Sequence, residues 1–242
     1  ELNIPEDFSA DNNTIRYGHR SAAEQEIYFI ANRTDTFQRV ICRFRAEGEP
    51  ELWTGTTGET RKMTNYSVNG GITSIPMEFF PFESFLITFS KSKTGKAASA
   101  MGTDNFPEVH HVMTLEGSWE VSFDTVWGGP GRTVFQELTD WTIHELRGIK
   151  YYSGIAEYSK SFQFSKKDRN AKYYLDLGVL HDIARVKLNG KNMGIVWCAP
   201  WRLDISRALK DGDNELEIEV ANRWINRLLG DDLKQTLKPG AR

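Results

Sequence analysis

Short runs in which apolar and polar residues alternate recur along most of the chain, separated by residues that favour turns. In the range 38–46, every second residue is apolar and faces one side: Val40, Cys42, Phe44 and Ala46. A period of two is typical of a β-strand with one buried face. Similar short segments recur between residues 14 and 90, and none of them has a sustained helical period. This half of the chain is therefore predicted to be a β-sandwich.

The strongest pattern of the chain lies between residues 173 and 205. Alternating apolar residues lead up to Asn189-Gly190, the dipeptide best suited to a two-residue type I′ turn, because both positions require a positive φ. A hairpin closed at this dipeptide has these predicted pairs: Leu188 with Lys191, Val186 with Met193, and Ala184 with Ile195. Met193 and Ile195 are then expected on the buried face.

Two further segments of this half alternate in the same way. Trp119, Val121 and Phe123 share one face of a predicted strand, and the range 215–220 alternates apolar with Glu residues. Short helices are expected at 205–210 and after Trp224. Between the two halves, residues 93–108 are rich in Ser, Lys, Gly and Ala and have little to bury. We therefore predict a small sandwich, immunoglobulin-like or similar, at 1–92, a linker at 93–108, and a second sandwich at 109–242.

Composition narrows the class of protein. Hydrophobic residues make up 39% and charged residues 26% of the chain, and the net charge is -3. The charges are interspersed, so nucleic acid is not expected as a partner. No apolar run approaches the roughly 20 residues of a membrane helix, so no membrane partner is expected either. Cys42 and Cys198 match no metal or redox spacing and are expected to be buried thiols. The chain begins with Glu1, without a signal peptide, and we expect it to be a fragment.

Several segments resemble the β-sandwich region of large glycoside hydrolases. The likeness to the sugar-binding-type module in the C-terminal region of family 106 α-L-rhamnosidases rests on these segments: Lys150–Phe162, Leu175–Ser206 and Asn214–Asp231. The ranges His19–Arg33 and Pro50–Glu59 resemble the sandwich that precedes that module in the same family. The family tends to have an acidic residue and a proline after the tryptophan of the last range, whereas Trp53 is followed here by Thr54-Gly55.

This resemblance implies an all-β fold of two tandem sandwiches, of which the second is a galactose-binding-like jelly roll. It also implies a secreted or periplasmic parent enzyme that releases L-rhamnose from plant or bacterial polysaccharide. The catalytic carboxylates of the family belong to a barrel domain, and no part of this chain has the βα alternation of a barrel. The fragment is therefore expected to be non-catalytic, to support that missing catalytic domain, and to hold glycan near it.

Candidate catalytic and metal-binding groups are few in the sequence. Glu145, Glu157 and Asp182 are the sharpest candidates for a carboxylate pair, but turn caps, hydrogen bonds at strand edges or ion pairs are the better explanation for them. No cofactor is required. A structural calcium ion is a further hypothesis, with these possible oxygen ligands: Asp211, Asp213, Asp231 and Asp232.

Sugar binding has better support, because six of the seven tryptophans lie in the second half. Trp119 and Trp197 are on predicted strands and are expected in the core. Trp127 lies in a Gly-rich loop that favours an exposed ring. Trp201 and Trp224 lie beside Arg202 and Arg223. The candidate carbohydrate-binding residues are Trp127, Trp201, Arg202 and Trp224.

Charged and polar residues in the family-like segments form a second candidate surface. His19, Arg20, Asn226 and Arg227 are candidates for docking onto the missing catalytic domain, with surface ion pairing as the simpler explanation. Three other readings remain open: an autonomous carbohydrate-binding protein, a purely structural interaction module, and a small glycosidase. The interaction module predicts that the tryptophans of the second half are buried, and the glycosidase predicts two carboxyl groups that converge in a cleft.

Overall fold

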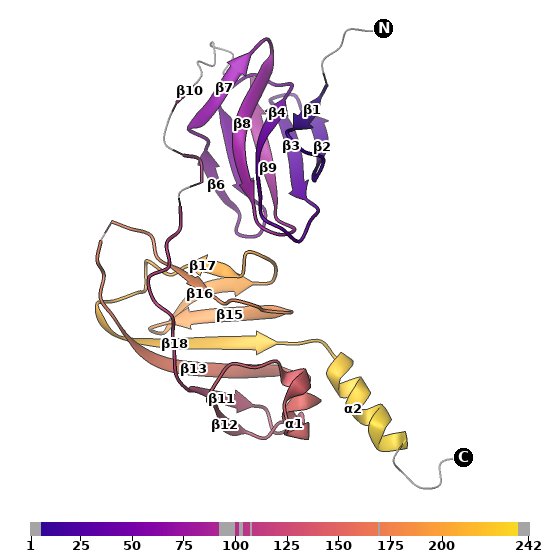
Figure 1. Ribbon diagram of the computed structural model, residues 1–242, viewed down its shortest axis with the longest axis vertical. Helices are drawn as coiled ribbons and strands as arrows, with labels where there is room; N and C mark the ends of the chain where they lie inside the picture. The colour runs from indigo at the N-terminus through magenta and orange to yellow at the C-terminus, as the bar shows by residue number, and fades with distance from the viewer. Residues whose placement is uncertain (1–5, 92–99, 102–103, 107, 169, 237–242) are drawn as a thin grey trace. The chain divides into compact units, whose positions relative to one another are not determined.

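Strands form most of the regular structure in the computed structural model, which describes residues 6–91, 100–101, 104–106, 108–168 and 170–236. The chain divides into two units, residues 1–111 and residues 112–242, each with its own hydrophobic core. Each unit is an antiparallel β-sandwich (Figure 1). The predicted all-β class with two tandem sandwiches is confirmed.

Two five-stranded sheets form unit 1. The first has the order β1-β4-β8-β7-β10, with these bounds: Phe8–Ala10, Gln38–Phe44, Ile72–Phe79, Asn65–Asn69 and Ala100–Met101. The second has the order β2-β3-β9-β5-β6, with these bounds: Ile15–Ser21, Gln25–Asn32, Ser84–Ser90, Pro50–Thr54 and Glu59–Lys62.

The core of unit 1 contains the apolar positions that alternation predicts. Val40, Cys42 and Phe44 are buried on the inner face of β4, and Ala46, just beyond the strand, is buried too. A hairpin at residues 69–71 joins β7 to β8, with Asn69 of β7 paired to Ile72 of β8. Both turn glycines have positive φ, which a residue with a side chain adopts only at a cost. Local pattern and turn chemistry therefore determine this part of the fold.

Residues 93–108 were predicted to be a linker, but several residues of this range that the structure describes contact the first sandwich. Ala100–Met101 pairs with β7 as an edge strand. The buried side chain of Asn105 accepts hydrogen bonds from the backbone N–H groups of Thr64 and Asn65, at 3.0 and 2.9 Å. These residues belong to the first sandwich, because backbone groups near its edge need hydrogen-bond partners.

A six-stranded sheet and a two-stranded sheet form unit 2. The larger has the order β12-β11-β13-β18-β15-β16, with these bounds: Arg132–Phe135, Trp119–Phe123, Ile155–Phe164, Gly212–Ala221, Ile183–Leu188 and Lys191–Val196. The smaller pairs β14, Tyr174–Asp176, with β17, Arg202–Asp204. The helical segments are η2, Trp141–Ile143, then α1, Arg147–Lys150, and α2, Ile225–Thr236. The range 205–210 forms a turn instead of the predicted helix.

The central hairpin forms at Asn189-Gly190, but its register differs from the prediction. Both turn residues have positive φ, and Leu188 pairs with Lys191 as expected. A β-bulge then shifts the pairing, so that Val186 lies opposite Gly194 and Ala184 lies opposite Val196. Because a shift of one residue exchanges the two faces of a strand, Val196 is buried and Ile195 is exposed. The prediction for Ile195 was therefore wrong, and that for Met193, which is buried, was correct.

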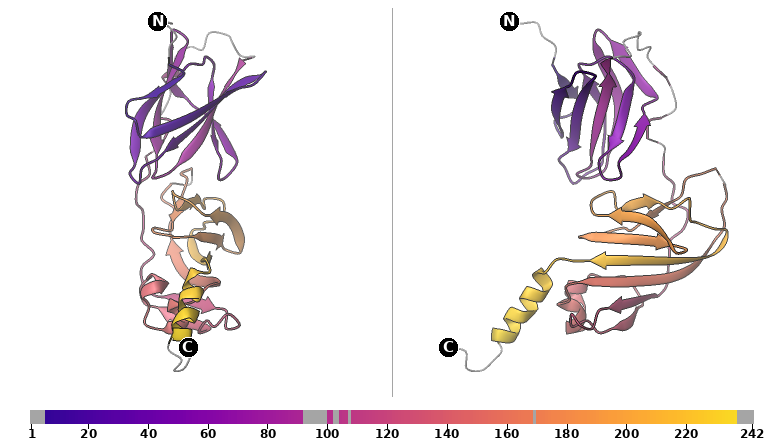
Figure 2. Two further views of the ribbon diagram at one scale, coloured as in Figure 1. Left: turned by 90° about the vertical axis from the view of Figure 1, so that its right-hand side faces the viewer. Right: turned by 180° about the vertical axis from the view of Figure 1, so that it is seen from behind.

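Helix α2 continues the chain from β18 and lies beside α1 in the views of Figures 1 and 2. Gly230 is the contact point: a Cβ atom there would lie 2.7 Å from Cβ of Tyr151, the residue that ends α1. The small residue lets the helix approach closely. The side of α2 that carries Gly230 packs against Tyr151. Three other apolar residues of the helix are exposed: Ile225, Leu228 and Leu229.

Candidate functional site

Trp127 and Trp224 come together at the surface of unit 2. Trp127 lies in the loop between β11 and β12, and Trp224 lies between β18 and α2. Their ring centroids are 5.5 Å apart with an interplanar angle of 76°, an edge-to-face arrangement that aromatic quadrupoles favour. The two residues are 50% and 59% exposed. The Trp127–Trp224 pair therefore presents a large apolar area to solvent.

Arg227 holds this pair in place from the first turn of α2. Its Nη1 donates to the backbone oxygen of Trp127 at 3.1 Å, and its Nε donates to Oδ2 of Asp231 at 2.9 Å. Its backbone N–H donates to Oγ of Ser153 at 3.0 Å. Oγ of Ser153, a buried side chain, donates in turn to the backbone oxygen of Arg223. The arginine is engaged within unit 2 and joins the loop to the helix.

Close packing also fixes the loop that carries Trp127. A Cβ atom on Gly129 would lie 2.6 Å from Cβ of Phe123 and 2.8 Å from the backbone oxygen of Asp124. Gly128 has a φ of 81°, and its N–H donates to the backbone oxygen of Thr125. The glycines thus allow a tight turn that packs closely against the end of β11. Trp127 lies in this turn.

The other two predicted carbohydrate-binding residues lie elsewhere in unit 2. Trp201 directly precedes β17, and Arg202 is its first residue; both are half-buried. The guanidinium of Arg202 lies 6.0 Å from the ring centroid of Tyr174 on the neighbouring β14. Figure 1 shows β17 and α2 at different ends of unit 2. The four residues therefore form two groups, not one patch.

The expectation that Trp119 and Trp197 belong to the core holds for one of them. Trp119 is buried, but Trp197 is 56% exposed at the end of β16. The bulge in the hairpin places Val196 inward and so turns Trp197 outward. Trp197 lines a hollow of about 390 Å³ together with His181, Asp182, Ile183, Ala221, Asn222 and Arg223. We call this feature the Trp197 hollow.

Sequence reasoning missed the hollow because its members come from three strand ends. Ile183 begins β15, Ala221 ends β18, and the two pair across the sheet. Asp182 and Arg223 flank this pair and form an ion pair of 2.7 Å between Oδ1 and Nε. The one available signal was the Asn192-Met193-Gly194 stretch, since Asn and Gly within a strand favour a bulge.

The predicted docking residues of unit 1 have different environments. The ring of His19 stacks on Tyr28 at a centroid distance of 4.0 Å. Its Nδ1 lies 2.9 Å from Oδ2 of Asp7, and its Nε2 lies 2.8 Å from Oε2 of Glu26. His19 is therefore tied into unit 1, whereas the neighbouring Arg20 is exposed. Asn226, a docking candidate in unit 2, is half-buried in the first turn of α2.

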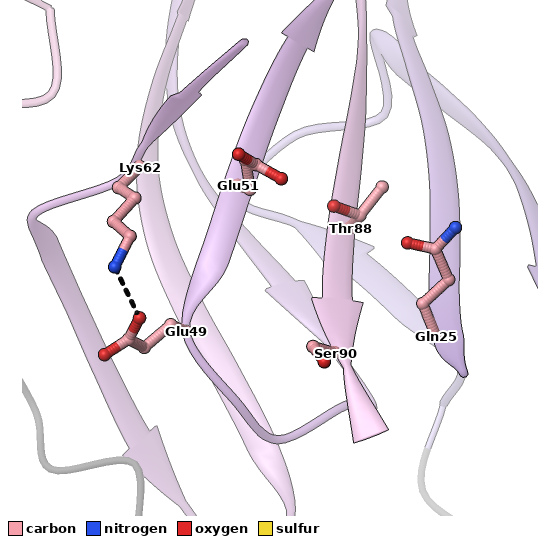
Figure 3. Close-up of a pocket in the computed structure, with 6 residues that line it drawn as sticks. All are labelled: Gln25, Glu49, Glu51, Lys62, Thr88 and Ser90. Atoms are coloured by element: carbon pink, nitrogen blue, oxygen red, sulfur yellow. Dashed lines mark hydrogen bonds and ion pairs between the residues drawn. The ribbon is translucent and has the colours of Figure 1, made fainter. Parts of the chain in front are cut away.

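A small hollow of about 100 Å³ lies on the second sheet of unit 1 (Figure 3), lined by Gln25, Glu49, Glu51, Lys62, Thr88 and Ser90. Glu49 pairs with Nζ of Lys62 at 3.0 Å, and Oε2 of Glu51 accepts a hydrogen bond from the indole of Trp53 at 3.2 Å. Ligand pockets usually enclose about 300–1,000 Å³, so this hollow is too small for a sugar ring.

The three candidate catalytic carboxylates do not converge. Glu145 is exposed near α1, and Glu157 is exposed on the outer face of β13. Asp182 is held by Arg223. Glu157 lies opposite Glu219, whose carboxylate pairs with Arg185 at 2.7 Å and with Lys187 at 3.2 Å. The hydrogen bond and charge of Glu219 raise the pKa of Lys187 above its usual value.

The candidate calcium ligands already have hydrogen-bond partners. Asp211 accepts the backbone N–H of Lys166 at 2.6 Å, and Asp213 accepts a hydrogen bond from the amide of Gln163. Asp231 pairs with Arg227. Among the residues that the structure describes, no group of three or more His, Cys, Asp or Glu side chains could hold a metal ion. Calcium binding stays a prediction. No helix within the described ranges is long and apolar enough to span a membrane.

Known proteins resemble both units. Residues 1–68 match the family described as alpha-L-rhamnosidase, glycoside hydrolase family 106, and residues 144–232 match the galactose-binding domain-like family of glycosyl hydrolase 2. The structure of a rhamnosidase from Novosphingobium sp. PP1Y aligns with 100% of this chain at 33% identity and a TM-score of 0.81. A putative beta-glucuronidase of Formosa agariphila is 48% identical over 126 residues, 51% of this chain.

The chain spans 22% of the Novosphingobium rhamnosidase chain and 11% of the Formosa protein. The two family matches fall in different units, and the solved rhamnosidase aligns with both. The predicted resemblance is therefore confirmed: unit 1 is similar to the alpha-L-rhamnosidases of glycoside hydrolase family 106, and unit 2 is similar to the galactose-binding domain-like family of glycosyl hydrolase 2.

Proposed function

We propose that this chain is a non-catalytic accessory region of an α-L-rhamnosidase-like glycoside hydrolase, and that its second unit holds glycan at the Trp127–Trp224 pair. The observation that carries the proposal is the exposure of both rings in a loop and a segment that are held rigidly by Arg227. Indole faces are suited to the apolar C–H faces of sugar rings, and a rigid pair loses little entropy on binding. The ligand class is rhamnose-containing polysaccharide of plants or bacteria, met in the periplasm or outside the cell.

The carboxylates support a non-catalytic role. Glycoside hydrolysis usually requires two carboxyl groups about 5–9.5 Å apart on either side of the scissile bond. Glu157 and Glu219 lie opposite each other, but on the open face of a sheet, and Glu219 is engaged by Arg185 and Lys187. We therefore assign bond cleavage to a part of the larger enzyme outside this chain. Glycan held here would be cleaved faster because its effective concentration near the active site rises.

The test is a tryptophan-fluorescence titration of the whole chain with rhamnose-containing oligosaccharides, with galactans and glucans as controls. The chain carries Trp197→Phe, so that the exposed indole of Trp197 adds no signal. We expect a saturable change that Trp127→Ala and Trp224→Ala each abolish. The matched control is Trp53→Ala, since Trp53 is also an exposed tryptophan but lies in unit 1. A change that survives both substitutions in unit 2, or no change with any glycan at millimolar concentration, would overturn the proposal.

Helix α2 supports a second role, in which the chain docks onto the rest of the parent enzyme. Ile225, Leu228 and Leu229 are spaced i, i+3 and i+4 and are all exposed. Such an apolar stripe usually marks a contact surface. The part of the parent enzyme outside this chain is the proposed occupant, because the matching rhamnosidase is several times longer than this chain.

This second role predicts that the rest of the parent enzyme, produced as a separate polypeptide, binds this chain. Leu228→Ser with Leu229→Ser should weaken that binding at least tenfold, measured by calorimetry. The matched control is Ile143→Ser, an exposed apolar residue of η2 in the same unit. Equal losses in the two variants would contradict docking through α2, and full retention of affinity would do so as well.

A further inference from the structure

The Trp197 hollow has the volume and the mixture of apolar and polar lining residues of a small-ligand site. Its volume of about 390 Å³ lies within the range of about 300–1,000 Å³ that small-molecule sites occupy. One wall is the exposed indole of Trp197, and Ile183 and Ala221 add apolar surface. The polar groups of Asp182 and Arg223 lie beside them. An apolar platform next to a few fixed polar groups is the usual composition of a ligand site.

The ion pair at the hollow leaves hydrogen-bonding capacity on both partners. Nε of Arg223 bonds to Oδ1 of Asp182, and this uses one of the five N–H donors of the guanidinium. Within the described part of the chain, no other hydrogen bond or ion pair engages either side chain. Oδ2 of Asp182 can therefore accept from one hydroxyl while an Nη of Arg223 donates to another. The ion pair places the two groups side by side, within reach of neighbouring hydroxyls.

Asn222 keeps this arrangement in place. Its side-chain oxygen accepts the N–H of Gly154 at 3.0 Å, and its amide nitrogen donates to the backbone oxygen of Tyr152 at 2.9 Å. Both hydrogen bonds reach across to the segment that precedes β13. The residue before Arg223 is thus fixed to the sandwich, so Asn222 is a positioning residue and not a ligand group.

We infer that the Trp197 hollow is a binding subsite for a single 6-deoxyhexose ring of the glycan. The ring stacks one C–H face on Trp197, and two neighbouring hydroxyls bond to Asp182 and Arg223. The C6 methyl group lies against Ile183 and Ala221 and covers part of their apolar surface. The inference rests on the proposed glycan-binding function but assigns a site other than the Trp127–Trp224 pair. Arg223 and Trp224 are adjacent, so one oligosaccharide can contact both sites.

The test uses the whole chain labelled with 5-fluorotryptophan, with each of the seven fluorine signals assigned through a Trp→Phe variant. Methyl α-L-rhamnoside is titrated in and followed by fluorine NMR. We expect a saturable shift of the Trp197 signal and no shift of the Trp53 signal. Methyl α-L-mannoside differs from methyl α-L-rhamnoside only by a hydroxyl group at C6. It should bind roughly fourfold more weakly, as expected for the loss of one buried methyl group.

Two variants test the polar half of the subsite. Asp182→Asn and Arg223→Gln should each weaken the Trp197 response about tenfold or more, since each breaks a charge-assisted contact to a hydroxyl. The matched control is Arg185→Gln, which removes another exposed arginine–carboxylate pair of the same sheet, that with Glu219. Circular dichroism checks that the variants are folded. Equal weakening in the control would overturn the assignment of the hydroxyl contacts.

The separate fluorine signals distinguish this inference from the proposed function. Shifts at Trp127 and Trp224 without a shift at Trp197 overturn the subsite and leave the proposed function standing. A shift at Trp197 alone supports the subsite and overturns binding at the Trp127–Trp224 pair. No shift at any of the three, with monosaccharide or with longer rhamnose-containing oligosaccharide, overturns both. A stronger response to L-mannoside than to L-rhamnoside overturns the 6-deoxyhexose preference.

Discussion

The side-chain amide of Asn189 donates a hydrogen bond to the side-chain oxygen of Asn214 across 2.8 Å. This contact ties the turn of the β15–β16 hairpin to the start of β18. Asn214 is 1% exposed and also donates to the backbone oxygens of Lys210 and Gly212. Asn189 accepts the N–H of Glu215 at 3.0 Å. The turn residue that closes the hairpin therefore also docks it onto the neighbouring strand.

Asn214→Ala is expected to lower the free energy of unfolding of unit 2 by about 2–4 kcal/mol, because it leaves the backbone groups of Lys210 and Gly212 and the Asn189 amide without this partner. Urea unfolding followed by tryptophan fluorescence measures the loss. Asn192→Ala is the control: Asn192 is exposed, and its side chain accepts one hydrogen bond, from Gly194 N–H. We expect about 1 kcal/mol or less there. Similar losses in the two variants would contradict the buried network.

Unit 1 should lose stability in acid through Glu26. Partial burial by itself raises the pKa of this carboxyl, but hydrogen bonds from Lys91, His19 and Ser21 outweigh it and lower the pKa below the usual value. The folded state therefore binds this proton less readily than the unfolded state. Its contribution to stability is present above the unfolded pKa of about 4.3 and is lost as the pH falls through the lower folded value.

Thermal unfolding from pH 7 to pH 2.5 measures this effect, with Glu26→Gln expected to flatten the acid limb of the stability curve. Glu78→Gln is the matched control, since Glu78 is similarly exposed, at 22% against 21%, and pairs with Arg39 at 2.6 Å. An acid limb that is as steep in Glu26→Gln as in the parent chain would show that Glu26 does not carry it.

Gly230→Ala should loosen α2 although alanine favours helices in general. The added Cβ would lie 2.7 Å from Cβ of Tyr151, which is closer than carbon atoms approach in proteins. Overpacking of this kind costs about 1–3 kcal/mol, more than the roughly 1 kcal/mol that helix propensity returns. Hydrogen exchange of the α2 amides should therefore speed up. Gly18→Ala, where a Cβ meets nothing within 4 Å, should leave exchange unchanged.

The two cysteines should differ in reactivity. Burial raises the pKa of the Cys42 thiol to about 12, and the nearby Asp11 carboxylate adds to the rise. Because the thiolate is the reactive form, Cys42 should react with a disulfide reagent at pH 8 at least 100-fold more slowly than Cys198, which is half-buried. Cys198→Ser should remove the fast phase, and urea should expose the slow thiol. A fast phase that persists in Cys198→Ser would refute the prediction.

Local chemistry made much of the fold predictable. The hairpin at Asn189-Gly190 formed where expected, because its turn requires two positive φ angles that this dipeptide tolerates. The alternation at Val40, Cys42 and Phe44 identified a buried face for the same kind of local reason. The linker at 93–108 was less predictable, since Asn105 contributes through hydrogen bonds that composition does not reveal.

The sequence by itself determined the all-β class and most strands and their turns, because these depend on residues that are neighbours in the chain. Only the tertiary structure decided that Trp127 meets Trp224, that a bulge turns Trp197 outward, and that Asp182 pairs with Arg223. Each of these relationships joins segments that are distant in sequence. Their geometry depends on how strands pair and close against one core, and no periodicity within a single segment encodes that.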